Sequence, residues 1–217
     1  MNIIITGTSG DIGRAIAEKF LREGHNVYGF DVREGVIDDP GYSHYVLDIQ
    51  KGEIPEIPSP DILINDAGTF DEKEAIDINL KGTIRFTEHF MDCESLKSIL
   101  FIASASARNG AEFPYYVASK AGIVGYMKNL AVNLPKKGRM VTVNSISPGG
   151  VITKSNAHIL EDPELKAAVM AESIFGKWAE PDEIADLAYY LTVINRSMTG
   201  EDLLIDNGEM LKSNFIW

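Results

Sequence analysis

The chain has 217 residues, of which 45% are hydrophobic and 24% are charged. This composition is typical of a folded globular protein rather than a disordered one, and the length suits one large α/β domain. The formal net charge is -12. Binding to duplex DNA or RNA needs a basic face that displaces counterions, so a nucleic-acid partner is not expected.

The sequence also bears on the compartment and on metal binding. The single cysteine, Cys93, cannot form an internal disulfide, which fits a reducing compartment. No apolar run approaches the ~18 residues that span a bilayer, and the first residues, NIIITG after the initial Met, show no basic leader. We therefore expect a soluble, cytoplasmic protein that does not bind membranes. The four histidines show no ligand spacing with cysteines or carboxylates, so no catalytic metal is expected.

Apolar runs and helical periodicity alternate along the whole chain. In chain order, the sequence predicts a strand at 2–6, a helix at 11–22, strands at 26–31, 44–48 and 61–65, a helix from about 72 to 91, a strand at 97–104, a helix at 115–134, a strand at 139–147, helices around 163–172 and 181–192, and a strand at 201–206. This alternation predicts one α/β domain: a doubly wound, Rossmann-type parallel sheet of about seven strands, in the order 3-2-1-4-5-6-7, with helices on both faces. Ligands bind such sheets at the carboxyl ends of the strands.

The link between the third and fourth predicted strands is unusual. Residues 49–60, IQKGEIPEIPSP, include three prolines where a crossover helix would normally lie. The link must cross roughly 14–15 Å of sheet and return perhaps ~20 Å along a strand. Twelve extended residues reach at most ~40 Å, so the link can be made without a helix. We predict an extended, proline-stiffened connection.

A glycine-rich turn, TGTSGDIG at residues 6–13, separates the first strand from the first helix. Its glycines allow a tight turn and a close approach of ligand to backbone, and the free N–H groups at the helix start then face a diphosphate. The expected contacts are Gly7, Ser9, Gly10, Asp11, Ile12 and Gly13. Because a diphosphate would repel the Asp11 carboxylate, we expect that side chain to turn to solvent or to cap the helix. A turn that binds nothing is the alternative.

Asp31 ends the second predicted strand, eighteen residues beyond Gly13. A carboxylate at this place accepts hydrogen bonds from the adenosine ribose hydroxyls. It also repels a 2′-phosphate, so NAD is expected in preference to NADP, although nearby Arg33 could partly reverse this. The alternative is a solvated acid at a strand end.

Six segments, in the right order, resemble the short-chain dehydrogenase/reductase family over nearly the whole chain. They are TGTSGDIG, LINDAG at 63–68, INLKGT at 78–83, IAS followed by YYVASKAG, VNSISPGGVIT at 143–153, and the C-terminal pair GKWAEPDEIADLAYYL and MTGEDLLIDNGE. The resemblance implies a nicotinamide cofactor and reversible hydride transfer between an alcohol and a carbonyl. It extends the expected cofactor contacts to Asp48, Ile49, Asn65, Ala67, Gly68, Tyr116, Lys120, Pro148, Gly149, Val151 and Thr153.

The resemblance also implies catalytic roles. Tyr116 would be the general acid/base, Lys120 its activator, Ser104 the carbonyl clamp and Asn79 part of a proton relay. An unperturbed tyrosine has a pKa of about 10, which a nearby cation lowers. Residues four apart share one face of a helix, so Lys120 is expected to lower the pKa of Tyr116. Tyr115, about 100° away on the helix, and Ser106 are the weaker alternatives.

Asn79 falls within a predicted helix, where its side chain competes for backbone bonds. A local kink that holds a water molecule would explain an asparagine there. A place on the helix surface is the alternative.

Some features depart from the family pattern. Glycines at 7, 10 and 13 resemble the extended branch of the family, such as sugar epimerases, and Asp66 replaces the second asparagine of the family's Asn-Asn-Ala-Gly segment. The short gap from Gly68 to Asn79 would leave one wall of the cleft open. A non-catalytic dinucleotide-binding or redox-sensing protein is therefore the alternative function. An epimerase or dehydratase of nucleotide sugars would need a longer C-terminal substrate domain.

We expect residues 148–175 to line the substrate pocket and residues 151–178 to form a small, mobile helical lid. Substrate closure often uses such segments. The resemblance further implies a homodimer or homotetramer formed through helices 79–91 and 115–134.

Overall fold

The computed structural model describes residues 1–211. Its centre is a seven-stranded sheet in the order β3-β2-β1-β4-β5-β6-β7, with every neighbouring pair parallel. The predicted fold class is confirmed. The strands are β1 (Asn2–Thr6), β2 (Asn26–Asp31), β3 (Tyr42–Val46), β4 (Ile62–Asn65), β5 (Ser98–Ile102), β6 (Thr142–Pro148) and β7 (Asp202–Ile205).

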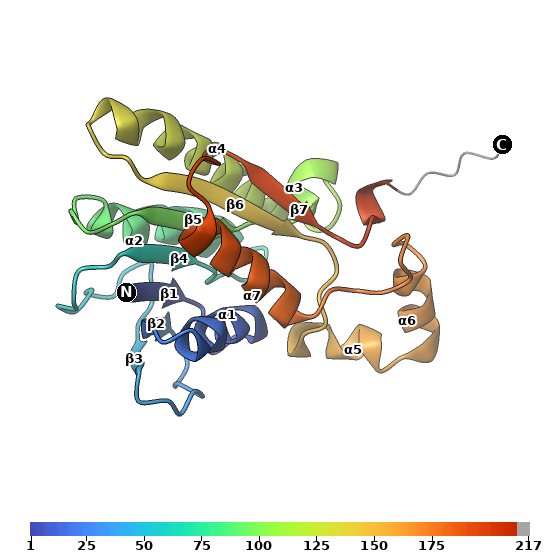
Figure 1. Cartoon of the computed structure of the whole chain (residues 1–217). Helices are drawn as coiled ribbons and strands as arrows, with labels where there is room; N and C mark the ends of the chain where they lie inside the picture. Colours follow the sequence, from blue (N-terminus) through green and yellow to red (C-terminus); the bar gives the residue numbers. More distant parts are fainter. Residues whose placement is uncertain (212–217) are drawn as a thin grey trace.

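Helices cover both faces of the sheet. They are α1 (Asp11–Arg22), α2 (Thr83–Phe90), α3 (Ser106–Asn109), α4 (Pro114–Lys136), α5 (Ala157–Leu160), α6 (Pro163–Met170) and α7 (Pro181–Tyr189), with π-helical η1 (Ile76–Gly82) and η3 (Tyr190–Ile194) and the short 3₁₀ turns η2 (Lys154–Asn156) and η4 (Glu209–Leu211). Helices α1 and α7 lie on one face, and α2 and α4 lie on the other (Figure 1).

The core consists of one apolar layer on each face of the sheet. Successive side chains of a strand point to opposite faces, so Ile3 and Ile5 of β1 pack toward α1 and α7 while Ile4 packs toward α2 and α4. Phe20 of α1 and Phe86 of α2 fill the two layers and are both 0% exposed. Burying a side chain of this size contributes ~1.5–3 kcal/mol. The strands that carry the site are therefore held from both sides.

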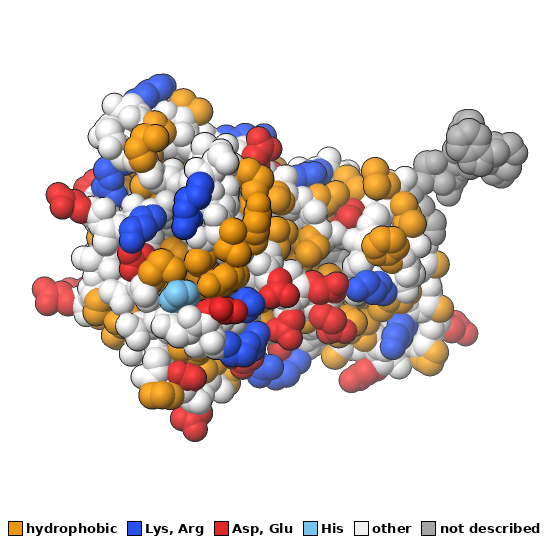
Figure 2. All heavy atoms as spheres, in the orientation of Figure 1, with side chains coloured by type: hydrophobic (Ala, Val, Ile, Leu, Met, Phe, Trp, Pro, Cys, Tyr) orange, Lys and Arg blue, Asp and Glu red, His pale blue; other side chains and the backbone are white. Residues whose placement is uncertain are grey.

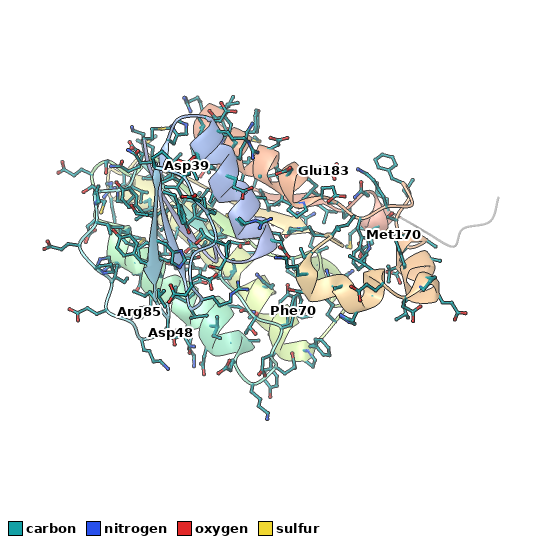
Figure 3. The ribbon with its side chains drawn as sticks, turned by 90° about the horizontal axis from the view of Figure 1, so that it is seen from below. Asp39, Asp48, Phe70, Arg85, Met170 and Glu183 are labelled. Atoms are coloured by element: carbon teal, nitrogen blue, oxygen red, sulfur yellow. The ribbon has the colours of Figure 1, made fainter. Side chains whose placement is uncertain are left out.

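The link between β3 and β4 contains no crossover helix, as predicted. Residues 52–60 form no helix or strand. Arg85 of α2 fixes the start of the link, because its guanidinium donates to the carbonyl oxygens of Ile49 at 2.9 Å and Gly52 at 2.7 Å. Figure 3 shows Arg85 beside Asp48, at the end of the segment that leaves β3. Side-chain bonds from α2 thus hold a connection that has no regular structure.

Several predicted element boundaries are wrong. Strand β6 begins at Thr142 and not at residue 139. Strand β3 is Tyr42–Val46, not 44–48, because it pairs only with β2, and their register ends at Asp31 opposite Val46. The helix expected from about residue 72 begins at Ile76, because Asp71 forms a tight turn in which its carbonyl oxygen accepts from the Ala75 amide at 2.8 Å. Helices α3 and α5 were not predicted, since four residues are too few to show helical periodicity.

Residues 151–178 carry η2, α5 and α6 and extend away from the sheet beyond the ends of its strands (Figure 1). On the face that bears α7, Figure 2 shows a band of hydrophobic side chains next to acidic side chains near the start of that helix. Among residues 1–211, no helix has both the length and the apolarity that crossing a membrane requires.

Candidate active site

A cavity of about 450 Å³ lies at the carboxyl ends of the central strands, between the sheet and residues 151–178. The loops that follow β1, β4, β5 and β6 converge there, as they must in a doubly wound sheet. The predicted site residues that line the cavity are Gly10, Asp11, Ile12, Gly68, Ser104, Tyr116, Lys120, Pro148, Gly149, Val151 and Thr153. Segments far apart in the sequence are thus brought together at one place.

Helix α4 presents Tyr116 and Lys120 on one buried face. Tyr116 is 6% exposed, whereas Tyr115 is 58% exposed. Of the two tyrosines, Tyr116 is the one that lines the cavity. The Lys120 Nζ atom lies 5.7 Å from the centre of the Tyr116 ring and donates to the carbonyl oxygen of Ile102 at 2.9 Å.

The electrostatics of this pair differ from the sequence prediction. Burial raises the pKa of Tyr116 well above its ordinary value, Glu112 and Asp66 add to the increase, and a hydrogen bond with Ser104 opposes it. Burial also lowers the pKa of Lys120, although Asp66 and Glu112 oppose that change. In the protein alone the pKa of Tyr116 is therefore raised and not lowered, because burial is the largest influence on it.

Two serines lie beside the phenol. The Ser104 Oγ atom accepts hydrogen bonds from the Ser106 hydroxyl at 2.9 Å and from the Ser106 amide at 3.2 Å. Both serines line the cavity together with Tyr116.

Asn79 lies in the π-helix η1 and is 1% exposed. The alternative of a place on the helix surface is wrong, because Asn79 is buried, and π-bulges occur frequently at functional sites. The side-chain Oδ1 atom of Asn79 accepts from the Thr69 amide at 2.7 Å. Its Nδ2 atom donates to the Thr69 carbonyl at 2.9 Å and to the Ser119 hydroxyl at 3.0 Å. The side-chain amide is thus committed to Thr69 and Ser119.

Phe70, in the short stretch before Asn79, covers part of the site. Phe70 stacks on Tyr116, with ring centres 4.6 Å apart and planes at 26°. Figure 3 shows Phe70 between the sheet and α6, which carries Met170. The Glu72 carboxylate accepts from the backbone amides of Tyr115 at 3.2 Å and Tyr116 at 3.1 Å, at the start of α4. Phe70 and Glu72 were missed, because nothing in the local sequence shows that this loop reaches α4.

The glycine turn is tight enough to require its glycines. Gly7 has φ +80, and the Gly10 amide donates to its carbonyl oxygen at 2.9 Å. A Cβ atom on Gly13 would collide with that same carbonyl oxygen. The turn thus brings bare backbone to the start of α1, where N–H groups have no partner within the helix.

Asp11 has a different role from the one expected. Its Oδ2 atom accepts from the Lys154 amide at 2.6 Å, and the N-cap of α1 is Gly10. The side chain therefore neither caps the helix nor points freely to solvent. It joins the glycine turn to η2.

Asp31 is a buried, fully bonded carboxylate and not a solvated one. It is 6% exposed and accepts from the Ser9 amide at 3.0 Å, from the Arg33 amide at 3.0 Å, and from the Arg33 guanidinium at 3.1 and 3.2 Å. Burial opposes its ionisation, but the bonds from Arg33 and Ser9 hold the pKa of Asp31 below its usual range. The Arg33 guanidinium thus bonds to both oxygens of the Asp31 carboxylate.

The segment after β4 contains two unusual polar groups. Asn65 is 4% exposed, and neither atom of its side-chain amide has a hydrogen-bond partner among residues 1–211. Burial raises the pKa of Asp66 to about 7, Lys120 opposes the increase, Asp31 adds to it, and the Gly13 amide opposes it. Buried polar groups are normally bonded. The unpaired amide of Asn65, where the sheet order reverses between β1 and β4, fits a polar nucleotide ligand.

Other predicted contacts, among them Asp48, Ile49 and Ala67, do not line the cavity. Ile49 is 5% exposed within the core, so its side chain is not available to a ligand. The Asp48 carboxylate accepts from the Gln50 amide at 2.8 Å. The backbone amide of Ala67 donates to the Thr6 hydroxyl at 3.1 Å, next to the glycine turn. Val151 pairs with Ala179, which fixes the chain after β6.

Two acids at the cavity were not predicted. The Glu209 carboxylate accepts from the Gly150 amide at 3.3 Å. Glu112 also lines the cavity. Both acids are placed at the cavity by loops whose path cannot be predicted from the local sequence. Among residues 1–211, no group of three or more His, Cys, Asp or Glu side chains is arranged to hold a metal ion. Cys93 is half-buried, and burial raises the pKa of its thiol.

Comparison with known proteins agrees with this geometry. Residues 60–209 match the family model described as Enoyl-(Acyl carrier protein) reductase. The chain is 30% identical to 3beta-hydroxysteroid dehydrogenase 1 of Eggerthella lenta, over 98% of this chain and 95% of the relative. It is 26% identical to L-rhamnose 1-dehydrogenase (NADP(+)) of Thermoplasma acidophilum, over 97% of this chain and 96% of the relative.

Solved structures show the same likeness. A 4-hydroxyisoleucine dehydrogenase mutant complexed with NADH and succinate superposes with a TM-score of 0.86 at 26% identity, over 99% of this chain and 100% of the other. This structural similarity agrees with the order of the sequence motifs, with the parallel sheet and with the Tyr116–Lys120 pair. The chain belongs to the short-chain dehydrogenase/reductase family of NAD(P)-dependent oxidoreductases.

Proposed function

We propose that this protein interconverts an alcohol and a ketone or aldehyde, with Tyr116 as general acid/base. The observation that carries the proposal is the buried Tyr116 phenol, which lines the cavity together with Ser104 and lies next to Lys120. The reaction needs one group that moves a proton to or from the substrate oxygen, and a hydrogen-bond donor that steadies charge on that oxygen. Tyr116 and Ser104 supply these two groups.

The dinucleotide would be held along the carboxyl edge of the sheet. The diphosphate would contact the glycine turn, at Gly7, Ser9, Gly10, Ile12 and Gly13. The adenosine would contact Asp31, Asp48 and the backbone of Ile49. The nicotinamide half and the adjoining ribose would contact Asn65, Ala67, Gly68, Lys120, Pro148, Gly149, Val151 and Thr153. When bound, the nicotinamide accepts or supplies the hydride.

The raised pKa of Tyr116 fits this scheme. A phenol kept protonated by burial is a competent acid for carbonyl reduction. In the oxidative direction Tyr116 must act as a base. The positive charge of an oxidised nicotinamide beside it would then add to that of Lys120 and lower the pKa of the phenol.

Asn79 would act through its backbone. Its side chain is occupied by Thr69 and Ser119. We infer that the π-helix positions the carbonyl group of Asn79 to bind a water molecule, and that the side chain fixes the bulge in place.

We propose NAD rather than NADP as the preferred cofactor. Two backbone amides fix the Asp31 carboxylate in place, whereas the Arg33 side chain is 62% exposed and can move away. The fixed charge repels a 2′-phosphate. Fluorescence titration with NADH and NADPH tests this preference, and tighter binding of NADPH would contradict it.

Three further features belong to this proposal. Residues 151–178 would form a lid over the substrate within a single domain. The protein would work in the cytoplasm, where its one thiol stays reduced. It would form a homodimer or homotetramer through its long helices, and light scattering that shows a monomer would contradict this.

The decisive experiment replaces Tyr116 by phenylalanine. The substrate panel follows the names of the relatives: a 3β-hydroxysteroid, L-rhamnose and 4-hydroxyisoleucine, each with NAD⁺ and NADP⁺. Tyr116→Phe should lower kcat by a factor on the order of 10² to 10⁴, which is the usual contribution of an acid/base group, while NADH binding is unchanged. Turnover equal to that of the native protein would refute the mechanism.

A non-catalytic dinucleotide-binding or redox-sensing role is the second candidate. The observations that favour it are the full occupation of Asp31 by its neighbours and the acid at position 66 beside the glycine turn. It requires cofactor binding without turnover of alcohols or carbonyls. Robust oxidation of any alcohol of the panel would rule it out.

A further inference from the structure

Three acids from separate segments of the chain line the cavity that contains Tyr116. Glu112 lies between α3 and α4, Glu172 follows α6, and Glu209 lies in η4, after β7. None of the three belongs to the glycine turn or to the other predicted cofactor contacts. The fold therefore brings three carboxylates to the part of the cavity that is left for a substrate.

The cavity has little positive charge to balance these acids. Lys120 is the one Lys or Arg side chain that lines it within residues 1–211, and its ammonium group donates to the carbonyl oxygen of Ile102 at 2.9 Å. In the same part of the chain, none of the three acids takes part in an ion pair. Carboxylates grouped in one cavity without counterions favour a positively charged ligand, because only a cation balances their charge.

The position of Glu209 is fixed by its surroundings. Its Oε2 atom accepts from the Gly150 amide at 3.3 Å and lies 2.6 Å from the position that a Cβ on Gly149 would take. The Asp206 carboxylate shapes the preceding turn by accepting from the Gly208 amide at 3.0 Å. The Glu209 carboxylate thus lies against the loop that follows β6, at the carboxyl edge of the sheet.

An aromatic ring lines the cavity at the same loop. A Cβ on Gly150 would collide with the Trp178 indole, so this ring packs directly on the glycine to which Glu209 bonds. Carboxylates and an aromatic face both attract an organic cation. A divalent metal ion fits less well, since no group of three or more His, Cys, Asp or Glu side chains within residues 1–211 is arranged to hold one.

The acids also lie close enough to affect one another. Burial raises the pKa of Glu209, the bond from the Gly150 amide opposes the increase, and Glu172 and Asp206 add to it. Burial also raises the pKa of Glu112, and Glu209 adds to that increase. A cation bound among these carboxylates would lower their pKa values and relieve the repulsion.

We propose that the substrate carries an ammonium group close to its reacting carbon, and that Glu209 binds this group, with Glu112 and Glu172 adding to the attraction. The substrate class is thus amino alcohols and the corresponding amino ketones. The inference rests on the proposed function, because the substrate oxygen must meet Tyr116 while the ammonium group lies at Glu209. A neutral sugar is the rival ligand, since carboxylates also accept hydrogen bonds from hydroxyl groups.

The test compares alcohols of similar shape and different charge. 3-Amino-2-butanol has an ammonium group where 3-methyl-2-butanol has a methyl group and 3-hydroxy-2-methylbutanoate has a carboxylate. The value of kcat/KM is measured for each with NAD⁺ and with NADP⁺ at about pH 7.5, where an alkyl amine is charged. Binding of each compound to the protein saturated with NADH is measured by calorimetry.

The native protein should prefer 3-amino-2-butanol to 3-methyl-2-butanol by at least about tenfold in kcat/KM, since hydrogen bonds between charged groups are worth roughly that factor. The hydroxy acid should be the poorest substrate. Glu209→Gln keeps an acceptor for the Gly150 amide but has no charge, and it should lower this preference about tenfold. Glu112→Gln and Glu172→Gln should lower the preference by smaller factors. The matched control, Glu94→Gln, changes an exposed acid outside the cavity lining and should keep the native preference.

Three results would overturn the inference. One is a kcat/KM for 3-methyl-2-butanol in the native protein that equals or exceeds that for 3-amino-2-butanol. Another is a kcat/KM for L-rhamnose above that for the amino alcohol, which would make the acids acceptors for sugar hydroxyls. The third is a native preference in Glu209→Gln that still binds NADH. The comparison of substrates in the native protein needs no variant, so it decides the matter even if Glu209→Gln does not fold.

The same experiment separates this inference from the proposed function. Turnover of the neutral alcohol without a preference for the amine would reject the ammonium site and leave Tyr116 as the acid/base. Absence of turnover with every alcohol would reject the proposed function. The binding measured by calorimetry would then decide the charge of the ligand, and equal binding of the amine and the neutral alcohol would reject the ammonium site as well.

Discussion

Replacing Asp66 by asparagine is expected to stabilise the protein, and to do so more strongly as pH rises. Asp66 lies against the glycine turn, where its Oδ2 atom is 2.7 Å from the position that a Cβ on Gly13 would take. Burial raises the pKa of Asp66 from 3.8 to about 7. Asparagine keeps the shape of the protonated acid but cannot ionise, so the variant isolates the energetic effect of the charge.

The sign and size of the effect follow from proton linkage. Between about pH 4 and pH 7 the folded protein keeps a proton on Asp66 that the unfolded chain has released. The free energy of unfolding therefore falls as pH rises through this window. A shift of ~3 pKa units corresponds to ~4 kcal/mol. The stability gained by Asp66→Asn should therefore grow from near zero at pH 4 to ~4 kcal/mol at pH 8, or on the order of 10 °C in Tm.

Urea unfolding of both proteins between pH 4.5 and pH 8 measures this difference directly. Asp61→Asn is a control of opposite sign. Burial opposes the ionisation of Asp61, but Lys97 and the Asn2 amide hold its pKa below the usual range, so its charge stabilises the protein above about pH 4. Asp61→Asn should lose stability at neutral pH. A difference between Asp66→Asn and the native protein that does not change with pH would refute the reasoning.

Two further predictions follow from the same contacts. Ionised Asp66 would repel a diphosphate at the glycine turn. The Kd for NADH, measured by fluorescence titration, should therefore rise as pH passes about 7 in the native protein but not in Asp66→Asn. An equal rise in both proteins would contradict this. Glu72→Ala removes the carboxylate that accepts from the first amides of α4, so the free energy of unfolding should fall by ~1 kcal/mol in thermal unfolding. The variant should also lower kcat more than it raises KM, because Tyr116 loses its fixed position. An unchanged Tm and kcat in that variant would show that the cap does not position Tyr116.

The sequence was sufficient for the parts of the fold that local patterns determine. Ile3, Ile4 and Ile5 form a continuous apolar run, which is what a strand buried on both faces requires, and the order of strands and helices then limits the topology. The helical spacing of Tyr116 and Lys120 correctly placed both on one buried face. The boundaries of β3 could not be predicted, because an edge strand ends where its one partner ends.

The surroundings of the site were much less predictable. Phe70, Glu72 and Glu112 all contact the Tyr116 region from loops, and only the path of the folded chain brings them there. For the same reason the direction of the pKa change at Tyr116 was mispredicted. Spacing on a helix indicates that a lysine is near, but the degree of desolvation depends on everything else that packs around the ring.

The bond from the Lys154 amide to Asp11 couples two halves of the molecule that could otherwise be altered independently. Exchanging residues 151–178 for the corresponding segment of a relative, in order to change substrate choice, would also disturb the first turn of α1. Protein engineers who graft such a segment would need to keep a backbone donor opposite position 11, or accept altered nucleotide affinity together with the new specificity.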